Sequence, residues 1–106
     1  MTNIVYIIYS KSLELYYIGE TESRDERLKQ HNTNYYAGSY SSKAKDWDYV
    51  WVISTKNRNE ARKIETHLKA MKSRKYIHKL VYDLDFKNGF KAFVKGKLDI
   101  TINQIL

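Results

Sequence analysis

IVYIIYS at residues 4–10, followed after five residues by YYIGE at residues 16–20, decides the fold of this chain. Both stretches are rich in β-branched and aromatic residues, and the first has apolar side chains on both of its alternating faces, which is typical of a strand covered on both sides. The linker at residues 11–15 is short enough for a hairpin, so we expect an antiparallel pair. That pairing would bring Tyr6 and Tyr17 onto neighbouring strands.

The sequence after this hairpin alternates helical and extended patterns. Ser23 and Glu26 fit a capping box, so we expect a helix over residues 24–31, then a long irregular loop to residue 46 and a strand over residues 47–54. A second helix is expected after Asn57, a cap that pairs with Glu60, and a shorter basic helix over residues 73–80. Apolar residues at helical spacing mark the face of the second helix that meets the core: Ala61, Ile64, Leu68 and Met71.

The C-terminal part of the chain carries weaker signals. Asn88 and Gly89 form a dipeptide typical of a tight hairpin turn, so a hairpin is expected there. The pattern as a whole predicts one α+β domain with a three-stranded antiparallel sheet and helices packed on it. We assign residues 1–81 to that domain and residues 82–106 to an extension packed on it.

Composition narrows the classes of function. The chain has 106 residues with 19 Lys and Arg against 12 Asp and Glu, a net charge of +7, which favours a polyanionic partner such as nucleic acid. Cysteine is absent, which excludes disulfides and thiolate chemistry. The apolar run at residues 4–8 is too short to cross a membrane and no basic leader precedes it. We therefore expect a cytoplasmic protein without a membrane partner.

Five residues on the expected elements could together hydrolyse a phosphodiester, which requires an activated water, a cation facing phosphorus and help for the leaving oxygen. Arg27 and His31 are four apart and share one helix face, although a solvated face would explain them too. Glu65 lies beside the apolar stripe and needs a partner, which could be Mg²⁺, Mn²⁺ or a nearby lysine. Tyr6 and Tyr17 could handle a proton or simply pack as strand aromatics.

The order of these residues resembles the GIY-YIG nuclease family. Val5-Tyr6 followed by Tyr17-Ile18-Gly19 is similar to the paired motif that names the family. Residues 26–32, ERLKQHN, and residues 59–75, which include Glu65, resemble its later helices, so the resemblance extends over residues 4–81. The family has a small three-stranded antiparallel sheet with helices packed about it.

The resemblance implies a DNA endonuclease that uses one divalent metal ion, Mg²⁺ or Mn²⁺, held by Glu65. It makes Tyr6 and Tyr17 the motif tyrosines, Arg27 the cation facing the transition state, and His31 a residue for proton transfer or phosphate positioning. We expect Tyr6 to deprotonate the water and Tyr17 to position the water or the phosphate, although the two roles could be exchanged. Two positions depart from the family pattern: Ile4 stands where glycine is frequent, and Glu20 where some members have lysine.

Further residues are candidates for DNA contact. Gly19 would allow a phosphate to approach the backbone closely, although a simple bulge explains it equally well. Lys43 and Lys45 lie in the long loop with Tyr35, Tyr36 and Tyr40, a composition suited to stacking on bases and to phosphate contact, or to an ordinary solvated loop. Two alternatives to the enzyme stay open: a non-catalytic nucleic-acid-binding module with a decayed site, and a basic adaptor for an acidic protein.

Overall fold

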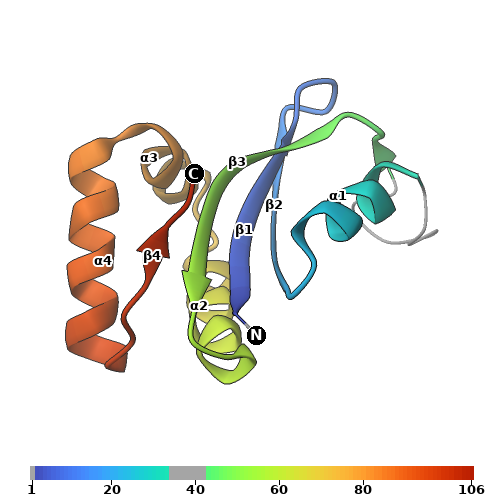
Figure 1. Cartoon of the computed structure of the whole chain (residues 1–106). Coiled ribbons are helices and arrows are strands. Elements are labelled where there is room, and N and C mark those ends of the chain that lie inside the picture. The colour runs from blue at the N-terminus through green and yellow to red at the C-terminus, as the bar shows by residue number, and fades with distance from the viewer. Residues whose placement is uncertain (1, 34–42) are drawn as a thin grey trace.

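The structure, a computed structural model, describes residues 2–33 and 43–106. Four strands form one antiparallel sheet in the order β2-β1-β3-β4, so β1 is central and β2 is an edge strand (Figure 1). The first of the four helices follows the β1–β2 hairpin, and the other three follow β3. The elements are β1 (Asn3–Ser10), β2 (Leu15–Thr21), α1 (Arg24–Asn32), β3 (Trp47–Thr55), α2 (Arg58–Met71), α3 (Arg74–Tyr82), α4 (Leu84–Leu98) and β4 (Asn103–Gln104).

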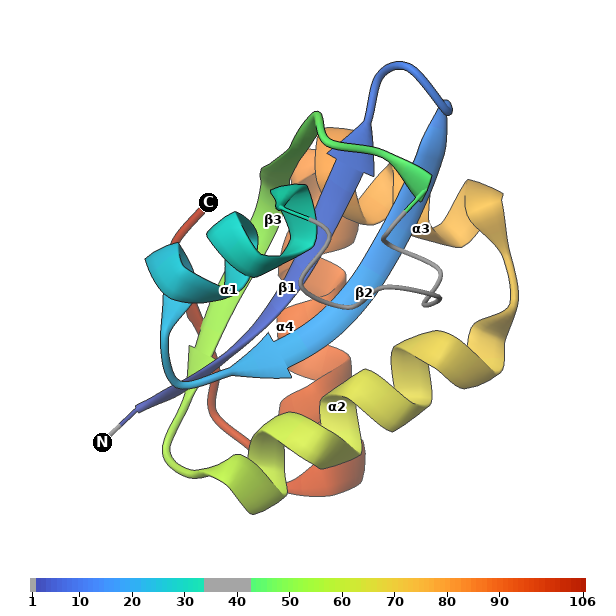
Figure 2. The same cartoon turned by 90° about the vertical axis from the view of Figure 1, so that its right-hand side faces the viewer.

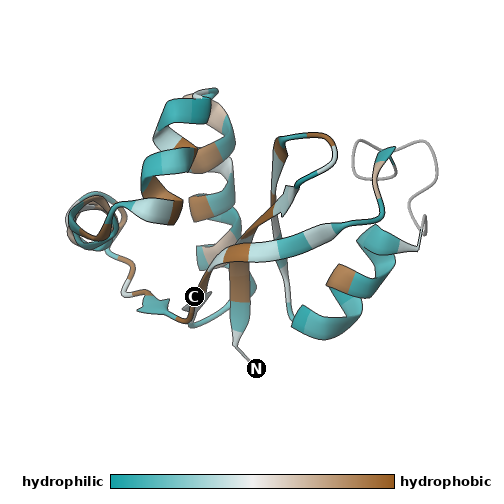
Figure 3. Ribbon diagram, turned by 90° about the horizontal axis from the view of Figure 1, so that it is seen from above, coloured by the Kyte–Doolittle hydropathy of each residue, from teal (hydrophilic) through white to brown (hydrophobic). Residues whose placement is uncertain are grey.

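The two faces of the sheet are covered by different helices. Alternation along β1 sends Val5 and Ile7 into a core shared with α2, α3 and α4, while Tyr6 and Ile8 enter a smaller cluster that includes Leu28 of α1. Figure 2 shows α1 on one side of the sheet and α4 on the other, and Figure 3 shows the same layers from above. The α+β class is thus confirmed, and the larger core lies on the α2 side.

The expected positions of the strands and of the first three helices are confirmed. At α2 the side chain of Asn57 accepts a hydrogen bond from the Glu60 amide at 2.9 Å, as the capping pattern predicts. At α1 the expected capping box is wrong, because the Ser23 side chain makes no cap bond. Instead the Ser23 amide donates to Oγ1 of Thr21 at 3.1 Å. A hydroxyl from the preceding strand therefore orders the start of α1.

Residues 83–98 correct the prediction of a hairpin. Asn88 and Gly89 lie inside α4, which begins with the Asp83 side chain accepting a hydrogen bond from the Phe86 amide. Both residues are exposed, while Phe90 and Val94 on the opposite side of the helix are buried. Burial of that helical stripe outweighs the local turn preference of the Asn-Gly pair.

Two smaller differences concern the edges of the molecule. The sheet has a fourth strand, because the two residues of β4 pair with Ile53 and Ser54 of β3. Met71 is 39% exposed, contrary to its expected place in the core, because it lies in the last turn of α2, just before the chain reverses at Lys72. The aromatic residues Tyr35, Tyr36 and Tyr40 lie outside the described residues.

Candidate active site

The register of the hairpin places the two motif tyrosines on one face of the sheet. Tyr6 pairs with Gly19, and Ile8, which shares a face with Tyr6, pairs with Tyr17. A Cβ atom built on Gly19 would lie 2.3 Å from Oη of Tyr6 and 2.5 Å from its Cζ. The tyrosine ring therefore lies across the second strand in the space that glycine leaves open.

His31 joins these tyrosines from α1. Its Nε2 shares a hydrogen bond of 2.8 Å with Oη of Tyr6, and its ring centroid lies 5.0 Å from that of Tyr17. Tyr6 and His31 are 1% and 2% exposed, so both are enclosed between the sheet and the helix. Tyr17 is only partly buried and lies at the opening of the site.

Helix α1 is fastened to β3 near both of its ends, which fixes His31. Near the start, the Tyr49 hydroxyl donates a hydrogen bond to the Arg24 carbonyl. At the end, the Asn32 side chain donates to the Trp47 carbonyl at 2.9 Å and accepts from the Trp47 amide at 2.7 Å. This pair of bonds satisfies the backbone where β3 begins and holds the last turn of α1 against the sheet.

The imidazole of His31 is neutral at physiological pH. Burial and, as the smaller cause, the nearby charge of Arg27 together lower the pKa of His31 to about 4. A neutral imidazole can accept a hydrogen bond from the Tyr6 hydroxyl when its Nε2 carries no proton. Tyr6 and His31 thus share a buried hydrogen bond in which both side chains are neutral.

Glu65 approaches the same site from α2, on the side of the edge strand. Its side chain is 21% exposed, and Oε2 lies 3.7 Å from Nζ of Lys69, one turn further along the helix. The Lys69 ammonium also lies 5.9 Å from the centre of the Tyr17 ring, within cation–π range. The expected place of Glu65 at the edge of the core is confirmed, and it has the lysine partner that was one of the alternatives.

Tyr17 lies between charges of opposite sign. Burial raises the pKa of Tyr17, and the Glu65 carboxylate raises it further, while the Arg27 guanidinium lowers it. Arg27 is partly buried on α1 and acts on both Tyr17 and His31. The fold therefore brings all five sequence-predicted residues into one site: Tyr6, Tyr17, Arg27, His31 and Glu65.

Glu20 does not leave a net negative charge beside this site. Its Oε1 lies 3.3 Å from Nε of Arg58 and 4.0 Å from Nε of Arg62, both on α2. Arg27 and Arg58 also line a small cavity of about 190 Å³ beside Glu20. The negative charge of Glu20 is therefore offset by Arg58 and Arg62 of α2.

The remaining candidates for DNA contact lie at different depths. Gly19 is buried beneath Tyr6, whereas Lys43 and Lys45 are exposed on either side of the buried Ala44. Asp46 anchors the end of this segment, because its carboxylate accepts hydrogen bonds from Ser10, and from both the amide and the hydroxyl of Ser12. DNA binding by Gly19, Lys43 and Lys45 stays a prediction.

The donor set suits a hard cation with few protein ligands. Across residues 2–33 and 43–106, no group of three or more His, Asp or Glu is placed to hold a metal ion. Glu65 supplies one carboxylate at the candidate site. A single carboxylate fits Mg²⁺ or Mn²⁺, which commonly keep several waters and add substrate phosphate oxygens.

Sequence reasoning missed Lys69, although its spacing of four from Glu65 is a helical ion-pair signal that could have found it. Among the described residues, no helix combines the length and apolar character that crossing a membrane requires.

The family model of the GIY-YIG catalytic domain matches residues 2–77, from the residue before β1 into α3. The chain therefore belongs to the GIY-YIG family and has its nuclease-type fold. No match is found among the curated proteins. The match ends before α4 and β4, so these two elements lie outside the matched residues.

Proposed function

We propose that this protein is a divalent-metal-dependent endonuclease that hydrolyses phosphodiester bonds in DNA. The observation that carries the proposal is the buried hydrogen bond between Tyr6 and His31 beside the partly buried Tyr17, whose pKa both Glu65 and Arg27 influence. A group that exchanges a proton, a carboxylate for a metal and a cation for the phosphate are thereby available within one site. The +7 charge of the chain supports a polyanionic substrate.

Tyr17 is the better candidate to take the proton from the attacking water. It is accessible, whereas Tyr6 is 1% exposed beneath α1. This assignment is the exchange of roles that the sequence left open. Because burial and Glu65 raise the pKa of Tyr17, the phenolate is scarce at neutral pH, and Arg27 acts to favour it.

Tyr6 and His31 act as positioning residues in this proposal. The neutral imidazole shares a hydrogen bond with Tyr6 and packs against the ring of Tyr17, which helps to hold that ring in place. Arg27 would face the negative charge that develops on the phosphate. A divalent cation held by Glu65 supplies, when bound, positive charge opposite that phosphate.

Single-turnover cleavage of labelled DNA tests the proposal. Glu65→Gln should lower the rate by about 10²-fold or more, in line with loss of one preorganised stabilising group, while binding measured in Ca²⁺ persists. Glu26→Gln is the matched control, because Glu26 is an exposed carboxylate on α1, and it should cleave at the wild-type rate. EDTA should abolish cleavage by the wild type.

A non-catalytic DNA-binding module is the second candidate. The ion pair between Glu65 and Lys69 favours it, because the carboxylate already has a partner of opposite charge. That interpretation predicts DNA binding without cleavage in Mg²⁺ or Mn²⁺.

A further inference from the structure

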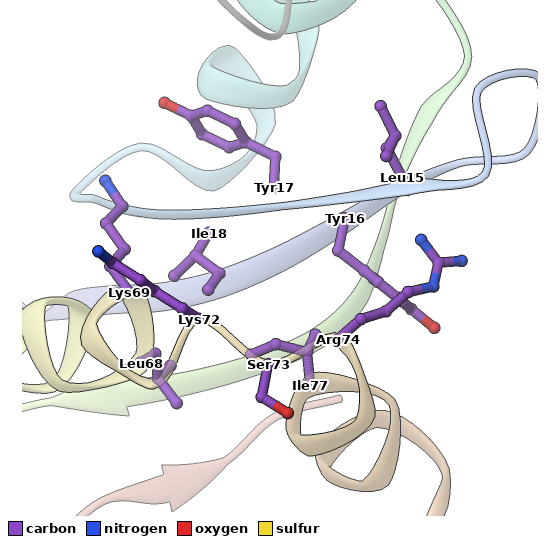
Figure 4. A pocket seen from close by; sticks show the side chains of 10 residues that line it. All are labelled: Leu15, Tyr16, Tyr17, Ile18, Leu68, Lys69, Lys72, Ser73, Arg74 and Ile77. Carbon is purple, nitrogen blue, oxygen red and sulfur yellow. The ribbon is translucent and has the colours of Figure 1, made fainter.

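A cavity of about 470 Å³ opens along the edge strand next to the candidate active site. It lies between β2 and the turn that joins α2 to α3, as Figure 4 shows. Tyr17 and Lys69, which belong to the candidate active site, are also part of its lining. The cavity and the candidate active site therefore adjoin each other at Tyr17 and Lys69.

The floor of this cavity is apolar. Ile18 of β2 and Leu68 of α2 line it, together with Leu15 and Ile77. Leu68 is 1% exposed and Ile77 6%, so both are held firmly by the core below them. A phosphate alone would find no hydrogen-bond donor on such a floor, whereas a flat ring would exclude water from it.

The walls of the cavity are cationic. Lys69 extends toward Tyr17 at one end with Lys72 beside it, and Arg74 lies beside Tyr16 at the other end (Figure 4). The Arg74 guanidinium lies 5.3 Å from the centre of the Tyr16 ring and donates to the Glu14 carbonyl at 2.5 Å. These two contacts hold the guanidinium in place, and its other N–H groups remain available to donate to a phosphate.

The backbone at Lys72 supports a functional use of this wall. Lys72 ends α2 in the left-handed region at φ 48°, a position where helices usually have glycine. A side chain there costs free energy that glycine would not. Its long cationic side chain lines the cavity, which gives a reason for lysine in place of glycine.

We propose that the cavity receives one unpaired nucleotide that flanks the cleaved bond, with its base on the apolar floor and its phosphates against Lys69, Lys72 and Arg74. This inference rests on the proposed function and adds a substrate class. A base in an intact duplex must leave its stack to enter such a cavity, which costs least where the nucleotide is already unpaired. The preferred substrate is therefore DNA with a single-stranded segment, such as a flap, gap or single strand.

The first experiment compares a perfect duplex with the same sequence carrying a flap, a gap or no complementary strand. Single-turnover cleavage by the wild type should be at least about tenfold faster on the DNAs with unpaired nucleotides. An abasic site moved one position at a time along the unpaired strand should slow cleavage at one position next to the cut. The wild-type protein is used throughout, so these results do not depend on the folding of a variant.

The second experiment uses charge-matched variants. Lys72→Ala with Arg74→Ala should remove most of the preference for unpaired DNA, whereas Lys63→Ala with Lys75→Ala should keep it. The control lysines are exposed on α2 and α3 and do not line the cavity. Thermal unfolding of both double variants checks that the fold is retained.

Equal cleavage of perfect and unpaired DNA, with no position sensitive to the abasic site, would overturn the substrate class while leaving the proposed nuclease intact. If no DNA is cleaved, the nuclease proposal fails. DNA affinity measured in Ca²⁺ then tests separately whether the cavity binds an unpaired nucleotide. Weaker binding of a strand with an abasic site would support nucleotide binding in the cavity, and equal binding would overturn it. If the Lys72 and Arg74 double variant keeps the preference for unpaired DNA, nucleotide binding in the cavity is likewise overturned. A protein segment would then be the better candidate for the cavity.

Discussion

Gly19→Ala should destabilise the fold even though alanine is compatible with the backbone at this position. The new methyl carbon would lie 2.3 Å from Oη and 2.5 Å from Cζ of Tyr6, far inside van der Waals contact. Tyr6 is 1% exposed, with its ring packed against Tyr49 at 5.4 Å and bonded to His31, so it cannot move aside without disturbing both. Overpacking of this kind costs about 1–3 kcal/mol of the free energy of unfolding.

Urea denaturation followed by circular dichroism would measure this cost. The control is Gly96→Ala in α4, where a Cβ meets nothing within 4 Å, and which should stabilise by about 0.5–1 kcal/mol because alanine is the better helix former. Combining Gly19→Ala with Tyr6→Ala should give less than the sum of the two single effects. Wild-type stability of Gly19→Ala, with loss of DNA binding alone, would refute this reasoning and favour phosphate approach as the role of the glycine.

Three further predictions concern titration and charge. The pKa of His31 falls from 6.5 to about 4 on folding, so between these pH values His31 is protonated in the unfolded chain but not in the folded protein. The free energy of unfolding should therefore fall by about 3 kcal/mol as the pH drops through that window. Denaturant titrations of His31→Gln should lack this part of the pH dependence. If Tyr17 takes the proton, the single-turnover rate should rise about tenfold per pH unit through neutrality, and a Tyr17→Phe variant with the same slope and rate would exclude that role. Lys69→Met should tighten Mn²⁺ binding, because it removes the cation that lies 3.7 Å from the Glu65 carboxylate. Electron paramagnetic resonance without DNA would measure this affinity, and unchanged or weaker binding would show that Glu65 is not the ligand.

The sequence was sufficient for the elements that carry the site, because their signals are local. The β-branched and aromatic run at residues 4–10 marks β1, and the stripe of Ala61, Ile64 and Leu68 marks α2. The ordered tyrosines, Arg27, His31 and Glu65 also indicated the family, which the match over residues 2–77 confirms. Local patterns thus predicted which residues would gather, but not how they would contact one another.

The parts that could not be predicted depend on tertiary contacts. Asn88 and Gly89 favour a turn locally, and only burial of Phe90 and Val94 against the sheet makes that segment a helix. Glu20 and Arg58 form an ion pair although they are 38 residues apart in the sequence, so no local sequence pattern predicts the contact. The cavity behind Tyr17 likewise needs β2 and two helices to be placed together before its lining exists.

The double hydrogen bond between Asn32 and Trp47 has a consequence for how this protein can vary. Asn32 directly follows His31, and its hydrogen bonds to Trp47 hold together the two residues that flank the segment 33–46. These bonds do not depend on the length of that segment. Lengthening a loop whose ends are already held together costs little, since closure entropy grows only with the logarithm of length. Insertions and deletions between these anchors can therefore accumulate during evolution, or be introduced by design, while His31 and Tyr6 keep their positions.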